Sequence, residues 1–104
     1  MGIGATHSMD IAPGLDTYVS SPMSFYNGTP VEQQQDIHAK LHGAFVAFAR
    51  TGDPNNDAVG LDWAPFTPET RAAMSIDASC ALLQNPNQAR LDAWGDLVLY
   101  DHAI

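Results

Sequence analysis

A histidine near the start of the chain has neighbours that suit acid–base chemistry. His7 follows the small residues Gly4-Ala5-Thr6, and the carboxylate residue Asp10 comes three positions later. An imidazole changes charge near neutral pH, so a loop histidine close to a carboxylate is a candidate general base. Ser8 is a poor nucleophile for it, because residues adjacent in sequence have poor geometry for a bond between Oγ and Nε2. The alternative interpretation of these residue types is a solvated loop histidine without a catalytic role.

Two other groups of polar residues contain parts of metal-binding patterns. His38 and His42 are four residues apart, a spacing that lets two imidazoles of one helix bind the same ion. The sequence places no third ligand beside them, so we interpret both as solvated histidines. The stretch 53–57 reads Asp-x-Asn-x-Asp and begins like a calcium loop, but alanines replace the turn glycine and the bidentate glutamate that such a loop needs. We therefore expect no metal ion and no other cofactor.

Capping signals and apolar spacing predict one long helix. Thr29-Pro30-Val31-Glu32 predicts a helix start with a capping box, in which Thr29 is the N-cap. Gly52 is a stop signal, so the helix is expected over 29–52. Its apolar stripe contains Ile37, Leu41, Ala44, Phe45 and Phe48. Gly43 costs about 1 kcal/mol relative to alanine inside a helix, and we expect close packing against another backbone to compensate.

The first and last parts of the chain carry weaker helix signals. We expect residues 1–28 to form a loop region that bears His7 and includes one short helical turn around 15–19. Asn85, followed by a proline, predicts the N-cap of a closing helix over 86–100. Fraying is expected at the end of this helix.

The middle of the chain reads as loop and hairpin. Residues 53–85 predict a polar loop followed by a small β-hairpin, with strands near 74–77 and 80–83. Cys80 falls in an apolar strand and is expected to be an inert buried thiol. The large aromatic residues are interpreted as core residues or as residues of a former interface: Trp63, Phe66 and Trp94. Residues 1–104 therefore predict a single domain, mainly α-helical with a small β-hairpin.

The composition argues against several classes of partner. Twelve acidic residues against four basic ones give a net charge of −8, which disfavours nucleic acid and anionic membranes as partners. No apolar run approaches the roughly 18–20 residues of a membrane-spanning helix, and the start does not read as a signal peptide. A single cysteine cannot form an internal disulfide, which fits a reducing compartment, and we expect a cytoplasmic protein.

Four stretches share the order and spacing of a known family. They are 4–11 (GATHSMDI), 45–55 (FVAFARTGDPN), 63–66 (WAPF) and 71–77 (RAAMSID), the last followed by Asn85-Pro86. Together they resemble the C-terminal segment of the type-B carboxylesterases, the α/β-hydrolase group that includes the para-nitrobenzyl esterases. The first stretch resembles the loop that carries this family's catalytic histidine. The connection after Asp10 departs from the Pro-aromatic-Val-Phe segment that is common in the family.

The resemblance implies a fold and an activity. It implies the C-terminal piece of an α/β-hydrolase fold, lacking the central sheet, with His7 as the triad histidine that acts as general base and then as general acid. The family's nucleophile lies in Gly-x-Ser-x-Gly, a pattern that is absent from these 104 residues. We therefore expect this chain to be the C-terminal portion of a serine-dependent carboxylic-ester hydrolase, inactive alone, with the missing N-terminal esterase portion as its partner.

A second hypothesis is a non-enzymatic helical module that associates with itself or binds a partner. The apolar stripes of the two predicted helices need cover where no sheet is available, and exposed apolar patches drive association. This hypothesis predicts a homo-oligomer, with domain swapping as one route to it.

Overall fold

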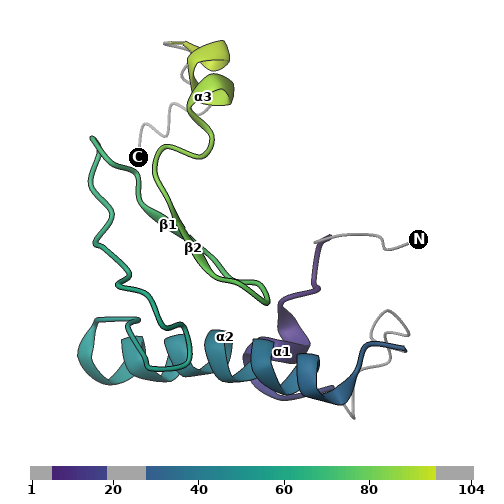
Figure 1. Ribbon diagram of the computed structural model, residues 1–104. Helices are drawn as coiled ribbons and strands as arrows, with labels where there is room; N and C mark the ends of the chain where they lie inside the picture. The colour runs from purple at the N-terminus through teal and green to yellow at the C-terminus, as the bar shows by residue number, and fades with distance from the viewer. Residues whose placement is uncertain (1–5, 19–27, 96–104) are drawn as a thin grey trace, which may run out of the picture.

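The computed structural model describes residues 6–18 and 28–95. Its elements, in chain order, are α1 (Ile11–Leu15), α2 (Val31–Thr51), β1 (Ala73–Ser75), β2 (Ala81–Leu83) and α3 (Gln88–Trp94). Figure 1 shows the hairpin rising from α2, with α3 at its far end. The prediction of a mainly helical chain with one small hairpin is therefore confirmed. No helix in the described ranges is long and apolar enough to cross a membrane.

The long helix α2 begins later than the capping signal predicts. Its first residue is Val31, and Pro30 is the N-cap, with a ψ of 141° and no side-chain capping bond. The predicted capping box is therefore wrong, because Thr29 stands one residue too early to cap the free amides of the first turn. The carbonyl of Thr29 instead accepts a hydrogen bond from Nε2 of Gln34 at 2.8 Å. At the other end, Gly52 adopts a φ of 78° and its N–H closes the last turn, as the stop signal predicts.

The short helix α1 lies against α2 (Figure 1). A helical turn was expected around 15–19, but the helix spans Ile11–Leu15, and position 19 lies outside the described residues. Its middle residues are buried: Ala12, Pro13 and Gly14. A β-carbon on Gly14 would lie 2.8 Å from Cε2 of Phe45 on α2, so the missing side chain is what permits this close approach.

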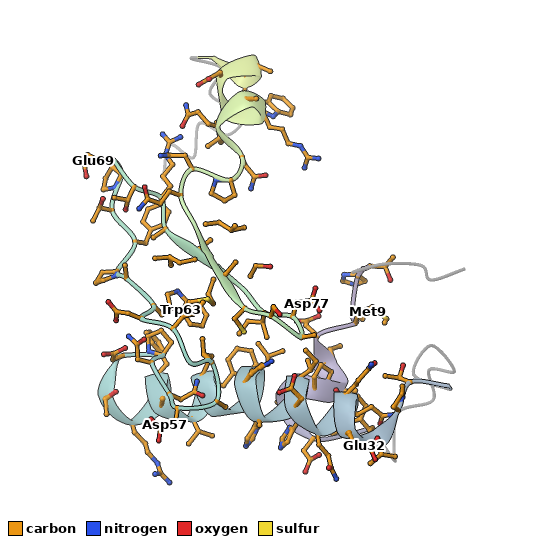
Figure 2. All side chains as sticks on the ribbon, viewed as in Figure 1. Met9, Glu32, Asp57, Trp63, Glu69 and Asp77 are labelled. Carbon is orange, nitrogen blue, oxygen red and sulfur yellow. The ribbon has the colours of Figure 1, made fainter. Side chains whose placement is uncertain are left out.

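The buried side chain of Lys40 attaches the hairpin turn to α2. Lys40 is 6% exposed, and its ammonium donates to Oδ2 of Asp36 at 2.7 Å and to the carbonyls of Asp77 and Ala78 at 3.0 and 2.9 Å. Figure 2 shows Asp77 at the tip of the hairpin, above α2. The strands pair antiparallel, with Ala73 opposite Leu83, Met74 opposite Leu82 and Ser75 opposite Ala81. Lys40 thus satisfies all three of its protons and fixes the hairpin turn on the helix.

The closing helix α3 starts from a different residue than predicted, and residues 96–104 lie outside the described part. Its N-cap is Asn87 and not Asn85, so the predicted cap is wrong. Asn85 adopts a φ of 48° and binds the preceding turn instead. Its N–H donates to the carbonyl of Thr70 at 3.0 Å, and its Nδ2 donates to the carbonyl of Glu69 at 3.2 Å.

Small residues fill the interior, while many large apolar side chains face outward. Besides Pro13 and Gly14 of α1, the buried apolar residues of the described part are Ala12, Ala44, Val59 and Ala72. Phe66 is 68% exposed and Trp94 56%, so their interpretation as core residues is wrong. The apolar pattern predicts Cys80 as a buried thiol within a strand. Cys80 is instead half-buried and lies in the turn before β2.

Candidate functional site

His7 lies on an exposed turn that leads directly into α1. The turn is closed by hydrogen bonds from the N–H of Met9 to the carbonyl of Thr6 at 3.2 Å and from the N–H of Ile11 to the carbonyl of Ser8 at 3.4 Å. Ser8 adopts a φ of 68°, a left-handed conformation that a non-glycine residue rarely adopts. Within the described residues, His7 makes no hydrogen bond or ion pair, and neither Ser8 nor Asp10 binds to it. Both ring nitrogens of His7 therefore remain open to other groups.

His38 and His42 bind the backbone of α1. Nδ1 of His38 lies 3.0 Å from the carbonyl oxygen of Pro13, and Nδ1 of His42 lies 2.8 Å from that of Gly14. A carbonyl only accepts, so in both imidazoles Nδ1 carries the hydrogen. The prediction of two solvated histidines is wrong, because both rings are half-buried against a helix that the sequence placed further along the chain.

The two imidazoles act together as a cap on the end of α1. Their rings are stacked, with centroids 4.8 Å apart and an angle of 27° between the planes. The last carbonyls of a helix have no partner within it, and here the histidines bind two of them while the carbonyl of Ala12 accepts from Thr17 at 3.1 Å. The carboxylate of Asp16 lies 3.9 Å from Nε2 of His38. No group of three side chains suited to hold a metal ion occurs in the ranges 6–18 and 28–95.

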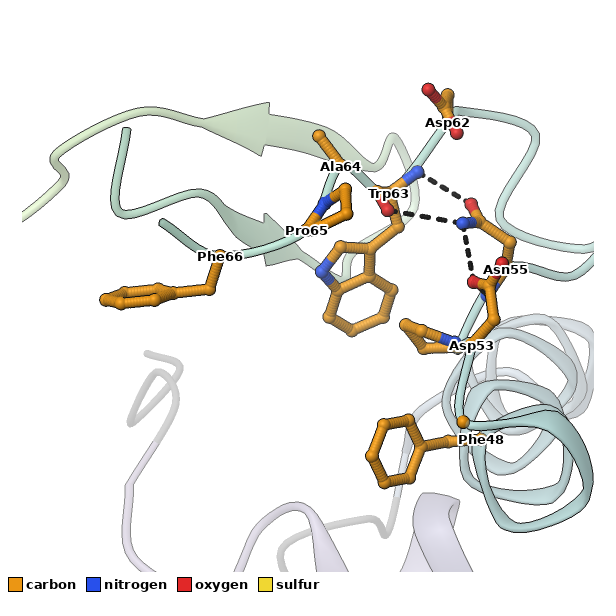
Figure 3. Close-up of a pocket in the computed structure, with 10 residues that line it drawn as sticks. Phe48, Asp53, Asn55, Asp62, Trp63, Ala64, Pro65 and Phe66 are labelled. Atoms are coloured by element: carbon orange, nitrogen blue, oxygen red, sulfur yellow. Dashed lines mark hydrogen bonds between the residues drawn. The ribbon is translucent and has the colours of Figure 1, made fainter. Parts of the chain in front are cut away.

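A second feature is the loop after α2, which Asn55 ties together. Its Oδ1 accepts from the N–H of Trp63 at 2.6 Å, and its Nδ2 donates to the carbonyl of Trp63 at 3.2 Å (Figure 3). Oδ1 of Asp53 accepts from the backbone N–H of Asn55 at 2.9 Å and from its Nδ2 at 2.7 Å. These two bonds, the backbone one first, hold the pKa of Asp53 below its usual value. The polar residues at 53–57 thus build a turn from their own hydrogen bonds.

An open groove of about 540 Å³ runs beside this loop. Its apolar wall includes Phe48 of α2, and Figure 3 shows Trp63 and Phe66 along it. Asn55 holds the backbone of Trp63 within the loop, while Phe66 is exposed. His7 is not among the residues that line the groove.

The sequence analysis did not identify the structural roles of four polar residues: His38, Lys40, His42 and Asn55. The i, i+4 spacing of the two histidines on α2 was visible, but their partners lie 25 and 28 residues away in the sequence. Lys40 is a charged residue next to an apolar stripe, and its partners in the hairpin turn lie 37 and 38 residues away. Nothing local in the sequence identifies these contacts.

The family model of the carboxylesterases, "Carboxylesterase family", matches residues 2–94. The Geobacillus stearothermophilus carboxylesterase EST55 at pH 6.2 is 26% identical and has a TM-score of 0.75, and the match covers 86% of this chain and 19% of that one. The same enzyme at pH 6.8 is 25% identical with a TM-score of 0.76, over 85% and 19%. The chain thus spans about a fifth of the length of these structures. No curated protein matches the sequence.

Proposed function

Because the chain belongs to the carboxylesterase family, we propose that it takes part in serine-dependent ester hydrolysis and supplies the histidine of the catalytic triad. The observation that carries this proposal is the state of His7. Its imidazole is exposed, lies on a hydrogen-bonded turn and engages no other described residue. A triad histidine uses both ring nitrogens, one for the serine and one for the orienting carboxylate.

The chemistry assigned to His7 follows the triad pattern. Nε2 takes the proton of a serine hydroxyl while Oγ attacks the ester carbonyl, and then gives that proton to the departing alcohol as the acyl-enzyme forms. In the second half, Nε2 takes a proton from water while the water oxygen attacks the acyl carbonyl, and Nε2 then gives that proton to the departing serine Oγ as the carboxylic acid is released. Each half-reaction returns the imidazole to its neutral form.

We propose that the serine, the triad acid and the oxyanion hole are contributed from outside these 104 residues. The sequence contains no Gly-x-Ser-x-Gly, and no serine of the described residues bonds to His7. The portion that contributes them would carry the central sheet of the α/β-hydrolase fold and would be the partner of this chain. On this proposal the chain alone does not hydrolyse esters.

A chimaera tests the assignment of His7. This chain replaces the aligned segment of the Geobacillus stearothermophilus carboxylesterase, and the hydrolysis of p-nitrophenyl acetate is measured for the chimaera and its His7→Ala variant. We expect the substitution to lower kcat by at least about 10³-fold. The matched control is Gln35→Ala on the exposed face of α2. An active chimaera that keeps its kcat after His7→Ala would overturn the proposal.

Two further measurements keep the test decisive where the full exchange fails to fold. A second chimaera exchanges only residues 6–18 and disturbs the rest of the enzyme less. The chain alone is assayed on the same ester, where we expect no more than the rate of free imidazole. Turnover by the chain alone that is lost in His7→Ala would show that the nucleophile lies within these 104 residues, against the proposal.

The alternative function is a self-associating or partner-binding module without catalysis. The observation that favours it is the exposed apolar surface, to which Leu15, Val31, Phe48, Phe66 and Trp94 each contribute a side chain that is more than half exposed. Apolar patches of this kind mark association surfaces. Retained activity in the chimaera with loss in His7→Ala would favour the first function over this one.

A further inference from the structure

We propose that His38 and His42 are positioning residues for His7, acting through α1. The inference rests on the proposed function of His7 as the triad base. It assigns a part in the reaction to two residues on α2 that touch neither the ester nor His7. Three links carry it: the continuity of the backbone from His7 into α1, the attachment of α1 to α2, and the precision that a triad base requires.

The first link is the backbone between His7 and the end of α1. Successive hydrogen bonds run from the N–H of Met9 to Thr6, of Ile11 to Ser8, of Gly14 to Asp10 and of Thr17 to Ala12, at 3.2, 3.4, 2.9 and 3.1 Å. The turn that carries His7 and the helix that follows are therefore one hydrogen-bonded unit. A shift of the helix moves the turn with it.

The second link is the attachment of this unit to α2. A five-residue helix is too short to be stable on its own, so tertiary contacts must hold it in place. Apolar contact is supplied where Gly14 meets Phe45. The direction of approach is fixed by the two imidazoles, because Nδ1 of His38 and Nδ1 of His42 each bind one carbonyl at the end of α1, at 3.0 and 2.8 Å.

The stacking of the two rings couples the two hydrogen bonds that attach α1 to α2. With centroids 4.8 Å apart and planes within 27° of parallel, each ring limits the rotation of the other. Their donors are aimed at the carbonyls of adjacent residues, Pro13 and Gly14. Two directed bonds to neighbouring peptides define both the position and the orientation of α1, which one bond does not.

The third link is the precision needed at His7. Catalytic groups must be held within about 0.5 Å of the productive geometry, and a displacement of about 1 Å costs on the order of 100-fold in rate. Such a displacement affects proton transfer more than it affects the binding of the ester. Loss of the two donors should therefore lower kcat by about 10- to 100-fold and leave KM nearly unchanged.

The first test uses the full chain and does not depend on catalysis. Long-range 1H–15N NMR spectra above pH 8 report which ring nitrogen of each histidine carries the hydrogen. We expect hydrogen on Nδ1 in both His38 and His42, as their carbonyl partners require. Hydrogen on Nε2 in either ring would show that the corresponding bond to α1 does not exist and would overturn the proposal.

The second test measures catalysis in the carboxylesterase chimaera. His38→Phe with His42→Phe keeps two stacked rings and removes both donors. His38→Asn with His42→Asn restores a donor, because Nδ2 of asparagine, like Nδ1 of histidine, lies two bonds from Cβ. We expect kcat to fall by about 10- to 100-fold in the phenylalanine variant and to recover most of that loss in the asparagine variant, at constant KM. Gln35→Asn is the control for helix propensity.

The outcomes separate the two proposals. Activity that survives His7→Ala defeats the proposed function itself. Activity that is lost in His7→Ala, but unchanged in the phenylalanine variant, leaves that function standing and overturns the positioning role. A loss that asparagine fails to restore, or a change in KM without a change in kcat, also overturns it. Where the double phenylalanine variant does not fold, the single variants and the NMR spectra give the same decision.

Discussion

The side-chain amide of Asn56 occupies the space that a β-carbon on Gly43 would enter. Such a carbon would lie 3.2 Å from Oδ1 and 3.3 Å from Cγ of Asn56. The amide has little freedom to withdraw, because Oδ1 accepts from the N–H groups of Ala58 and Val59 at 3.0 and 3.3 Å, and Nδ2 donates to the carbonyl of Pro54 at 3.2 Å. The expectation that another backbone packs on Gly43 is therefore wrong. What packs there is a side chain that organises the loop after α2.

Gly43→Ala should consequently fail to stabilise the chain. An alanine in a helix interior is worth about 1 kcal/mol over glycine, but here the added carbon presses on a fixed amide. We expect the free energy of unfolding in urea to stay level or to fall. In an Asn56→Ala background the space is open, and the same change should stabilise by about 1 kcal/mol. A full 1 kcal/mol gain in the unmodified background would contradict this explanation.

Lys40→Met should destabilise the chain by about 2 kcal/mol, since it removes three charge-assisted hydrogen bonds made by a buried ammonium. Asp36→Asn removes only the ion pair with a carboxylate that is half exposed, and we expect it to cost no more than about 1 kcal/mol. Urea unfolding of the two variants measures the difference. Equal losses would mean that the ion pair, and not the pair of hairpin carbonyls, accounts for the contribution of Lys40.

A carboxyl titration by 13C NMR should find the pKa of Asp53 below its usual value. The causes are the backbone N–H of Asn55 first and its side-chain amide second. A lowered folded-state pKa stabilises the folded chain above the unfolded value of about 3.9, and this contribution is lost as the pH falls through the folded pKa. Asn55→Ala removes only the second cause, so the pKa should rise part of the way. An unchanged pKa in that variant would show that the side-chain bond contributes nothing.

The sequence predicts those parts of the fold that local signals determine. The long helix, its end at Gly52 and the hairpin all follow from spacing and stop signals, and the structure contains them. The caps are less well predicted, because Thr29 and Asn85 have good capping side chains but bind elsewhere or stand one or two residues away from the helix start. A side chain caps a helix only where the backbone places it beside the free N–H groups of the first turn. A helix start that differs by one residue changes which side chain is in that place.

The candidate site divides in the same way. The neighbouring residues and the family resemblance identify His7 in the sequence, and its catalytic role stays a prediction. The support beneath it was not predicted, because the bonds from His38 and His42 join residues that are 25 and 28 positions apart. Such contacts depend on how α1 meets α2. A short helix that contains Pro13 and Gly14 carries little periodic signal by which its position could be found.

The isolated chain should associate in solution. Large apolar side chains are exposed across the described part of the chain, and surfaces of this kind bury themselves against another copy when no other cover is available. Light scattering at increasing concentration should give a mass above the 11.2 kDa of one chain. The double substitution of Phe66→Ser with Trp94→Ser removes two of the most exposed rings and should shift the population toward the monomer. The control is Arg90→Gln, an exposed position on the same helix as Trp94. A mass that stays at 11.2 kDa at every concentration would contradict the association, and would leave contact with a different polypeptide as the use of this surface.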